Sequence, residues 1–467
     1  MKQLLILITI LALFGCEKEV GGKWKFIKKE IELKTDTITI KPTTPKVGFV
    51  IDTNWFNKKF VGYHIETHNG NGEGDFNKDG LKDLVVMFAT NSTANYLFQK
   101  DTSSRIVVGV FINYKTYFEL DTNLVYSYLG GYSGVNVSDL NNDGFLDLYQ
   151  MTGYWEGSQY TAPNYYNNNG HGGMDSYVYL NNQNKSLTRF VLPNKNDPGS
   201  TTSIIFDNNK NGYNEIYLSS CLCYFEYNGK EFLRNDLVLD RNFQNQSYNM
   251  NVLTPKYANK NVGLIYTAEN VHGDTYFILK LEGNKITPKV KYKPAYPNSG
   301  PAQEIYVEDL DKDSKLEYII PMEISSSSNN TTPAIPYLMI VDEAGNDVSK
   351  KYMDDEITKP LTYDQINWVG ETWQTGFIYH TFADIDNDNI NEIFPASGVG
   401  YKKDNKTYYY KFKDGKYRLE LYNNNWLGDV HKSKGYINYK PFVDEKNKVN
   451  VFLPVEGNLL NAIFKTF

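Results

Sequence analysis

Cysteine and strongly basic segments are both scarce in this chain. Only 3 of its 467 residues are Cys, and its formal net charge at pH 7 is −7. Three cysteines exclude a disulfide-stapled scaffold and a zinc ribbon. Because nucleic-acid binding usually needs a basic face, the acidic balance argues against a nucleic-acid partner.

Short catalytic motifs are also missing. The sequence has no H-E-x-x-H, no P-loop and no G-x-S-x-G, since GYSGV at 131–135 lacks the final Gly. The 6 His residues are scattered along the chain. We therefore assign no catalytic or cofactor-binding residues. Whether the protein is an enzyme stays open, with a non-enzyme favoured.

Long apolar runs are absent after the first residues. The run Leu4–Phe14 is too short to span a membrane comfortably, but it fits the apolar part of a secretory signal peptide. It leads into LFGC at 13–16, which resembles a bacterial lipobox. In that family the residues before the Cys are removed and the Cys is acylated. The alternative is an ordinary signal peptide in which Cys16 is incidental.

The lipobox resemblance implies a signal peptide over 1–15, lipidation of Cys16, and a lipidated, flexible tether over 16–46. Acyl chains on one residue anchor a protein to a membrane without a spanning helix. The tether contains KWKFIKKEIELK, which fits a short helix or a strand. We therefore expect a lipid-anchored protein of the bacterial cell envelope, at the outer membrane or the cell surface.

Turn-forming and aromatic residues are abundant. The chain has 35 Gly, 17 Pro, 38 Tyr and 25 Phe. So many aromatic residues exclude a disordered chain. The frequent turn residues favour β structure built from many short strands.

One sequence pattern occurs five times. Its copies are DFNKDGLKDLVV from Asp75, DLNNDGFLDLYQ from Asp139, DNNKNGYNEIYL from Asp207, DLDKDSKLEYII from Asp309 and DIDNDNINEIFP from Asp384. Each copy places Asp, Asn or Glu at positions 1, 3, 5 and 9, counted from its first Asp, and an apolar run follows. Each loop is named below by its first residue.

This spacing of oxygen-bearing side chains suits calcium, which takes roughly six to eight oxygen ligands. Side chains at positions 1, 3 and 5 of a tight loop point inward together, a backbone carbonyl at position 7 adds a ligand, and an acid at position 9 closes the shell. Gly or Asn at position 6 permits the left-handed turn. The predicted calcium ligands are Asp75, Asn77, Asp79, Leu81 and Asp83; Asp139, Asn141, Asp143, Phe145 and Asp147; Asp207, Asn209, Asn211 and Glu215; Asp309, Asp311, Asp313, Lys315 and Glu317; and Asp384, Asp386, Asp388, Ile390 and Glu392.

An EF-hand is the main rival to this interpretation. It requires a Glu at position 12 and flanking helices. Position 12 is Val86, Gln150, Leu218, Ile320 or Pro395, and the apolar runs fit strands better than amphipathic helices. The EF-hand is therefore excluded. The remaining alternative is a set of Asx-rich β-turns without metal.

The loop D-x-[DN]-x-[DN]-G-x-x-[DE], repeated at long intervals, resembles the FG-GAP or VCBS repeat, a group that includes the head domains of integrin α-subunits. The resemblance implies an all-β fold over 47–467, a β-propeller in which calcium loops join early strands of the blades. Degenerate copies at 257–269 and near Asp444 bring the total to about seven four-stranded blades. Strands from 47–64 and from the C-terminus would close the ring and hide the sheet edges.

The loops differ in charge. The Asp309 loop offers four carboxylates but has Ser314 at position 6, and in the Asp207 loop only Asp207 and Glu215 are charged. Because calcium affinity rises with ligand charge, we predict that the Asp207 loop is the weakest or is empty.

Two other groups of residues are candidates for a special role. A disulfide between Cys221 and Cys223 would be strained, so two small core residues are predicted there. The aromatic stretch 154–180, with Trp368 and Trp373, suits stacking against sugars or contact with a partner, and an ordered loop is the alternative.

The sequence thus favours a lipid-anchored β-propeller with structural calcium, acting as a binding or adhesion module for a glycan or a surface protein. Some polysaccharide lyases share the calcium-decorated propeller, so a polysaccharide-degrading enzyme is the first alternative. A structural component of an envelope complex is the second.

Overall fold

The protein is described by a computed structural model of residues 1–467, which contains two compact units, Met1–Pro45 and Lys46–Phe467. In the first unit, β1 (Phe14–Lys18) and β2 (Trp24–Lys28) form an antiparallel hairpin, so the stretch that fits a helix or a strand contains a strand. The residues that the structure describes are 14–18, 24–28, 48–59, 64–67, 72–90, 105–129, 135–150, 176–192, 203–218, 222–240, 253–269, 275–301, 305–324, 335–360, 380–384, 388–395, 401–403, 406–423, 442–443, 449–455 and 458–466.

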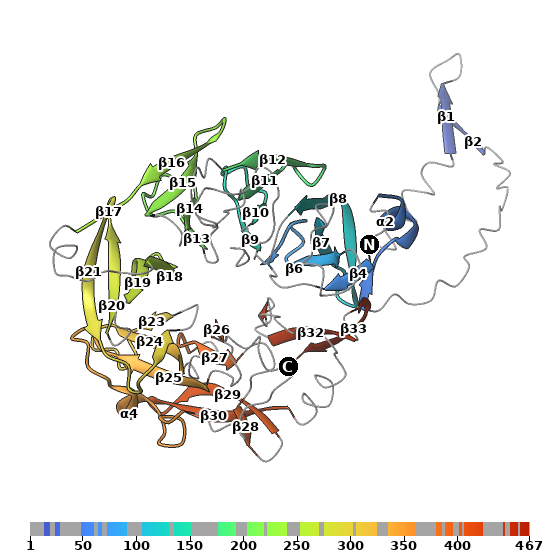
Figure 1. The fold of residues 1–467 in the computed structure, drawn as a ribbon. Helices are drawn as coiled ribbons and strands as arrows, with labels where there is room; N and C mark the ends of the chain where they lie inside the picture. The colour runs from blue at the N-terminus through green and yellow to red at the C-terminus, as the bar shows by residue number, and fades with distance from the viewer. Residues whose placement is uncertain are drawn as a thin grey trace. The chain divides into compact units, whose positions relative to one another are not determined.

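In the second unit, strands close in sequence pair antiparallel into separate sheets that follow one another in chain order (Figure 1). The first two sheets after β8 have four strands each, in the orders β12-β11-β10-β9 and β13-β14-β15-β16. Their strands are β9 (Val135–Ser138), β10 (Asp147–Gln150), β11 (Tyr177–Asn181), β12 (Leu187–Val191), β13 (Ser203–Phe206), β14 (Glu215–Leu218), β15 (Cys223–Tyr227) and β16 (Phe232–Asp236).

Three further sheets come next along the chain. They have the orders β17-β21-β20-β19-β18, β22-β24-β23 with β25 on β24, and β26-β27-β29-β28 with β30 on β29. Their strands are β17 (Val238–Leu239), β18 (Leu253–Asn259), β19 (Gly263–Glu269), β20 (Tyr276–Glu282), β21 (Lys285–Tyr292), β22 (Ser299–Pro301), β23 (Tyr306–Glu308), β24 (Glu317–Ile324), β25 (Ile335–Val341), β26 (His380–Ala383), β27 (Glu392–Pro395), β28 (Tyr401–Lys403), β29 (Lys406–Lys413) and β30 (Lys416–Asn423).

The two ends of the second unit share one nine-stranded sheet, ordered β3-β8-β7-β6-β4-β33-β32-β31 with β5 on β6. Asn458 of β33 lies opposite Glu66 of β4, which confirms that N-terminal and C-terminal strands pair. The pairing strand begins at His64, where the predicted segment 47–64 ends. The strands of this sheet are β3 (Gly48–Val50), β4 (His64–Thr67), β5 (Gly72–Gly74), β6 (Asp83–Thr90), β7 (Arg105–Asn113), β8 (Tyr117–Leu129), β31 (Phe442–Val443), β32 (Val449–Val455) and β33 (Asn458–Thr466).

Helices are short and few in the described part of the second unit. They are α2 (Thr53–Lys59) and α4 (Ser349–Tyr352). The carboxylate of Asp52 caps α2 by accepting hydrogen bonds from the backbone N–H groups of Asn54 (3.0 Å) and Trp55 (3.1 Å). Among the described residues, no helix, α2 and α4 included, is long and apolar enough to cross a membrane.

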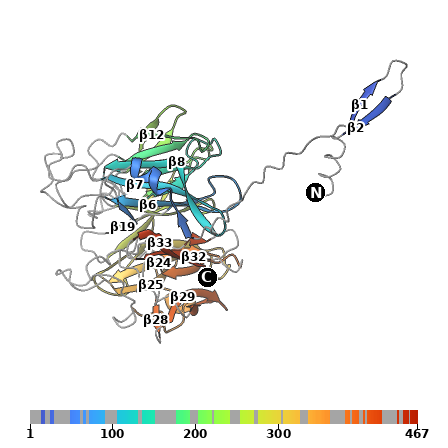
Figure 2. The ribbon, with the colours of Figure 1, turned by 90° about the vertical axis from the view of Figure 1, so that its right-hand side faces the viewer.

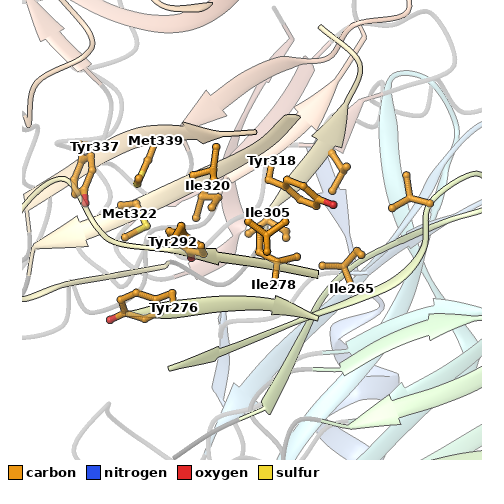
Figure 3. Packing of buried hydrophobic residues seen from close by; sticks show 14 residues of the cluster. Ile265, Tyr276, Ile278, Tyr292, Ile305, Tyr318, Ile320, Met322, Tyr337 and Met339 are labelled. Atoms are coloured by element: carbon orange, nitrogen blue, oxygen red, sulfur yellow. The ribbon is translucent and has the colours of Figure 1, made fainter. Parts of the chain in front are cut away.

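The hydrophobic core lies between neighbouring sheets. In Figure 3, Tyr276 and Ile278 of β20 pack in one cluster with Ile320 and Met322 of β24, which belongs to the next sheet. Equivalent clusters join each sheet to its successor, from the sheet of β6 and β7 to the sheet of β26–β30. Figures 1 and 2 place β12 and β28 at opposite edges of the unit.

Antiparallel sheets packed face to face in chain order, with the ends of the chain sharing a sheet, form a β-propeller. The predicted all-β propeller is therefore confirmed. The degenerate copy at 257–269 is indeed a polar turn between two strands, β18 and β19. The total of about seven blades stays a prediction.

Gly345 offers a test of the packing between sheets, because a Cβ there would lie 2.1 Å from the carbonyl oxygen of Lys291 in β21, and its φ is +88°. We expect Gly345→Ala to lower the free energy of unfolding by more than the ~1–2 kcal/mol that a left-handed alanine costs alone. Urea unfolding measures this change. The matched control is Gly283→Ala, where φ is +63° and nothing lies within 4 Å, so equal losses in the two variants would contradict the packing.

Candidate metal-binding loops

The five loops predicted from the sequence occupy the same place in five sheets. Each joins an early strand to the strand that begins at its position 9: β5 to β6, β9 to β10, β13 to β14, β23 to β24 and β26 to β27. In each sheet these two strands are hydrogen-bonded neighbours. The propeller therefore repeats one loop at one structural position, as the sequence predicts.

Position 1 holds the turn together in every loop. The two carboxylate oxygens of Asp75 accept hydrogen bonds from the backbone N–H groups of Asp79 (3.1 Å) and Gly80 (2.9 Å). The first Asp of each other loop accepts the same two bonds from its own positions 5 and 6. The carboxylate at position 1 is therefore fixed toward the inside of the turn.

The side chain at position 5 stabilises the turn by a hydrogen bond to the backbone at position 7. One oxygen of Asp79 accepts a hydrogen bond from the N–H of Leu81 at 2.8 Å, and the other loops repeat this contact between positions 5 and 7. The backbone N–H group at position 7 thus donates a hydrogen bond within the loop, at Leu81, Phe145, Lys315 and Ile390. That their carbonyl groups bind calcium stays a prediction.

The turn contains two left-handed residues, of which the sequence pattern predicts only one. Position 6 is left-handed as predicted, with φ +84° at Gly80, and Ser314 and Asn389 adopt the same conformation with φ +69°. Position 4 is left-handed as well, at Lys78, Asn142, Lys210 and Lys312. Lys gives no turn signal in a sequence, so this second feature is missed.

The acid at position 9 is buried. Asp83 and Asp147 have no exposed surface. The two oxygens of Asp83 accept hydrogen bonds from the N–H of Phe76 in its own loop and of Asn113 at the end of β7, both at 2.8 Å. Asp147 makes the equivalent bonds to Leu140 (2.8 Å) and Asn181 (2.7 Å). Position 9 therefore joins the loop to the third strand of its sheet.

Burial changes the acidity of these carboxyl groups. It raises the pKa of Asp83 to about 6, with a further contribution from the charges of Asp79 and Asp75. In the next loop, burial raises the pKa of Asp147 to about 7, and the charges of Asp143 and Asp139 act in the same direction. Each loop thus concentrates negative charge around a carboxyl group that is deprived of water.

The donor set of the Asp75 and Asp139 loops fits calcium. Asn77 Nδ2 lies 3.0 Å from Asp79 Oδ2, and Asn141 Nδ2 lies 3.0 Å from Asp143 Oδ2, so positions 3 and 5 meet in both loops. Carboxylate and amide oxygens are hard ligands of the kind that calcium prefers. A cation beside them would relieve the repulsion among the carboxylates.

The Asp207 loop also contacts Glu226, a residue that the repeated sequence pattern does not predict. Glu226 of β15 accepts hydrogen bonds from the side-chain amides of Asn209 (3.3 Å) and Asn211. Glu215 at position 9 has no exposed surface, and its Oε1 has no hydrogen-bond partner among the described residues. Burial raises the pKa of Glu215 to about 7, and the charges of Glu226 and Asp207 add to this effect.

The Asp309 loop brings three predicted ligands together. One carboxylate oxygen from each of Asp309, Asp311 and Glu317 lies within 4.8 Å of the others. It is the one group of three or more such side chains found in the part of the chain that the structure describes. Asp313 instead forms an ion pair with Lys315, whose Nζ lies 2.9 Å from its Oδ2.

The first three loops also contact one another. The ammonium group of Lys78 in the Asp75 loop lies over the ring of Phe145 in the Asp139 loop, 3.7 Å from its centroid. The side-chain amide of Asn214, next to Glu215, donates a hydrogen bond to the carbonyl oxygen of Asp139 at 2.8 Å. The three loops thus form a continuous row along one end of their sheets.

Some predicted residues lie outside the described residues or side chains. Asp386, residues 154–175 of the aromatic stretch, Trp368, Trp373 and Cys221 are among them, as is the side chain of Cys16. Asp384, Asp388 and the buried Glu392 are described. Cys223 is buried in β15 as predicted, but it is disulfide-bonded, which corrects its interpretation as an unlinked core residue.

Comparisons with known proteins find weak similarities to solved structures. No protein-family model and no curated protein matches the chain. A protein from Lactobacillus plantarum is 9% identical with a TM-score of 0.39, covering 76% of this chain and 83% of that one. YCF48 from Cyanidioschyzon merolae is 13% identical with a TM-score of 0.38, covering 84% and 95%. The structure of a putative 6-phosphogluconolactonase from Bacteroides fragilis is 10% identical with a TM-score of 0.36, covering 73% and 80%.

Proposed function

We propose that this chain is a calcium-stabilised β-propeller that acts as a binding or adhesion module at a bacterial cell surface. The observation that supports the proposal most is the recurrence of one acidic loop, with one hydrogen-bond pattern, between successive pairs of strands. Side chains that serve only as turn formers do not require a buried acid at position 9 as well.

The calcium part of the proposal rests on charge. In the Asp75 loop, Asp75, Asp79 and Asp83 are all carboxylates, and Asp83 is fully buried. Without a cation, these like charges destabilise the folded loop. An ion that binds the folded loop and not the unfolded chain stabilises the fold by mass action. Extracellular calcium is abundant enough to fill sites with affinities of about 10⁻⁴ to 10⁻³ M.

The location is proposed from the N-terminal sequence, in which LFGC at 13–16 resembles a lipobox and Cys16 directly follows the predicted signal peptide, 1–15. The acylated Cys16 would attach the protein to the envelope membrane, and residues 17–46 would separate the propeller from it. Mass spectrometry of protein purified from a bacterial host that processes lipoproteins tests this. We expect a chain that begins at acylated Cys16, whereas a chain that retains Met1 or carries an unmodified Cys16 contradicts the anchor.

The architecture supports the proposed binding role. A propeller is a rigid scaffold whose strand connections are free to present side chains at its surface. The proposed partners are a glycan or a surface protein. The proposed contact residues are 154–175 of the aromatic stretch, with Trp368 and Trp373, since aromatic rings stack on sugars. The remainder of the stretch, 176–180, leads into and forms β11, where Val178 and Tyr179 are buried.

We expect calcium to raise the melting temperature of a version of the chain that begins at residue 17. A loop with a dissociation constant near 10⁻⁴ M gains about 1.4 kcal/mol in about 1 mM calcium. The measurement is a thermal melt in calcium and in chelator. The double variant Asp75→Asn/Asp79→Asn should lose part of the calcium-dependent shift, while Asp236→Asn, at an exposed position outside the loops, should keep it. The same midpoint in calcium and in chelator would refute structural calcium.

A glycan array tests the binding role. We expect the purified chain from residue 17 to bind one class of glycan, or to capture one surface protein in stoichiometric amount, and to lose that binding in chelator because the loops loosen. The control is the same chain unfolded by heat. Release of unsaturated products from acidic polysaccharides, or the absence of any bound glycan or surface protein, would contradict a binding module.

A further inference from the structure

In the Asp309 loop, a lysine from another element, α4, reaches one of the carboxylates. The ammonium group of Lys351 lies 2.6 Å from Asp311 Oδ2, the position-3 side chain. It also donates a hydrogen bond to the hydroxyl oxygen of Tyr352 at 2.7 Å. That hydroxyl lies 2.8 Å from Asp311 Oδ2 and 3.1 Å from Glu317 Oε1. Lys351 and Tyr352 thus link positions 3 and 9 of the loop.

The helix that carries Lys351 is held firmly against the same sheet. The hydroxyl of Ser349 in α4 accepts a hydrogen bond from the N–H of Ile340 in β25 at 2.9 Å. The N–H of Val348 donates to the carbonyl oxygen of Ile340 at 2.8 Å. Tyr352 is 2% exposed and packs in the cluster between this sheet and the next. The position of Lys351 therefore comes from a packed element of the fold.

The ammonium group of Lys351, whose side chain is 58% exposed, contacts one of the predicted metal ligands, Asp311. Calcium in a loop of this kind binds the oxygens at positions 1, 3 and 9, and those of Asp309, Asp311 and Glu317 already lie within 4.8 Å of one another. In the Asp75 and Asp139 loops, position 3 is an Asn that contacts position 5 within the loop. In the Asp309 loop, position 3 is an Asp that pairs with an ammonium group from a residue 40 positions later.

We propose that Lys351 replaces calcium in the Asp309 loop, so that this loop is closed by the chain's own cation. This loop therefore does not fit the metal that the sequence predicts for it, although it has four carboxylates, as many as the Asp384 loop. The ammonium group supplies the positive charge and Tyr352 supplies a hydrogen bond to position 9. Lys351 closes the Asp309 loop in this way whether or not the other loops bind calcium.

The test is the number of calcium ions bound per folded chain, measured by native mass spectrometry and isothermal titration calorimetry. Lys351→Met keeps most of the aliphatic stem and removes the charge. We expect this variant to bind one more calcium ion than the unmodified chain, because three carboxylates then lie together without a cation. Lys350→Met, on the same helix, is the matched control and should leave the number unchanged. In chelator, Lys351→Met should melt at a lower temperature, and calcium should restore the midpoint.

A second variant keeps the result decisive if Lys351→Met does not fold. Asp311→Asn in the unmodified chain removes a carboxylate from the loop, and we expect it to leave the number of bound ions unchanged, because no calcium binds there. The loss of one ion in Asp311→Asn, or an unchanged number in a folded Lys351→Met, overturns the inference. If the unmodified chain binds no calcium and Lys351→Met binds one ion, the proposed calcium function fails while this inference holds.

Discussion

Each loop depends on the buried carboxylate at position 9. Asp83 and Asp147 link two N–H groups from different parts of the chain, one in the loop and one at the end of the third strand. Moving a carboxylate out of water is costly unless hydrogen bonds or a positive charge compensate for it. The amide donors supply the first, and our proposal assigns the second to calcium, or in one loop to Lys351. Each acidic loop is therefore exposed at its tip and buried at its position-9 carboxylate.

The arrangement of the loops follows from the packing of the sheets. Among the described residues, clusters such as the one that contains Ile278 and Ile320 join consecutive sheets from that of β6 and β7 to that of β26–β30. The pairing of β4 with β33 brings the ends of the chain into one sheet. Because the sheets are fixed in this way, the loops that join equivalent strands lie in a row, and Lys78 and Asn214 connect consecutive loops.

The sequence predicts well the features that all five loops share. It does not predict the residues from elsewhere in the chain that contact single loops. The spacing of Asp75, Asp79 and Asp83 identifies the turn, and the apolar runs identify the strands, because both are local properties of the chain. Glu226 and Lys351 are missed because they reach the loops only through the fold, 15 residues from Asn211 and 40 from Asp311. The aromatic stretch 154–180, with Trp368 and Trp373, is only a weak signal of a contact site, because the chain has 38 Tyr and 25 Phe.

Crystals grown in calcium, with anomalous diffraction recorded at a long X-ray wavelength, test the central claim most directly. The account predicts anomalous peaks bounded by positions 1, 3 and 5 in the Asp75 and Asp139 loops, next to the buried carboxylates of Asp83 and Asp147. It predicts no such peak beside Asp311, where Lys351 supplies the charge. Loops with the same hydrogen bonds and no calcium peak at Asp75 or Asp139 would contradict it, because the acidic turns would then be stable without metal.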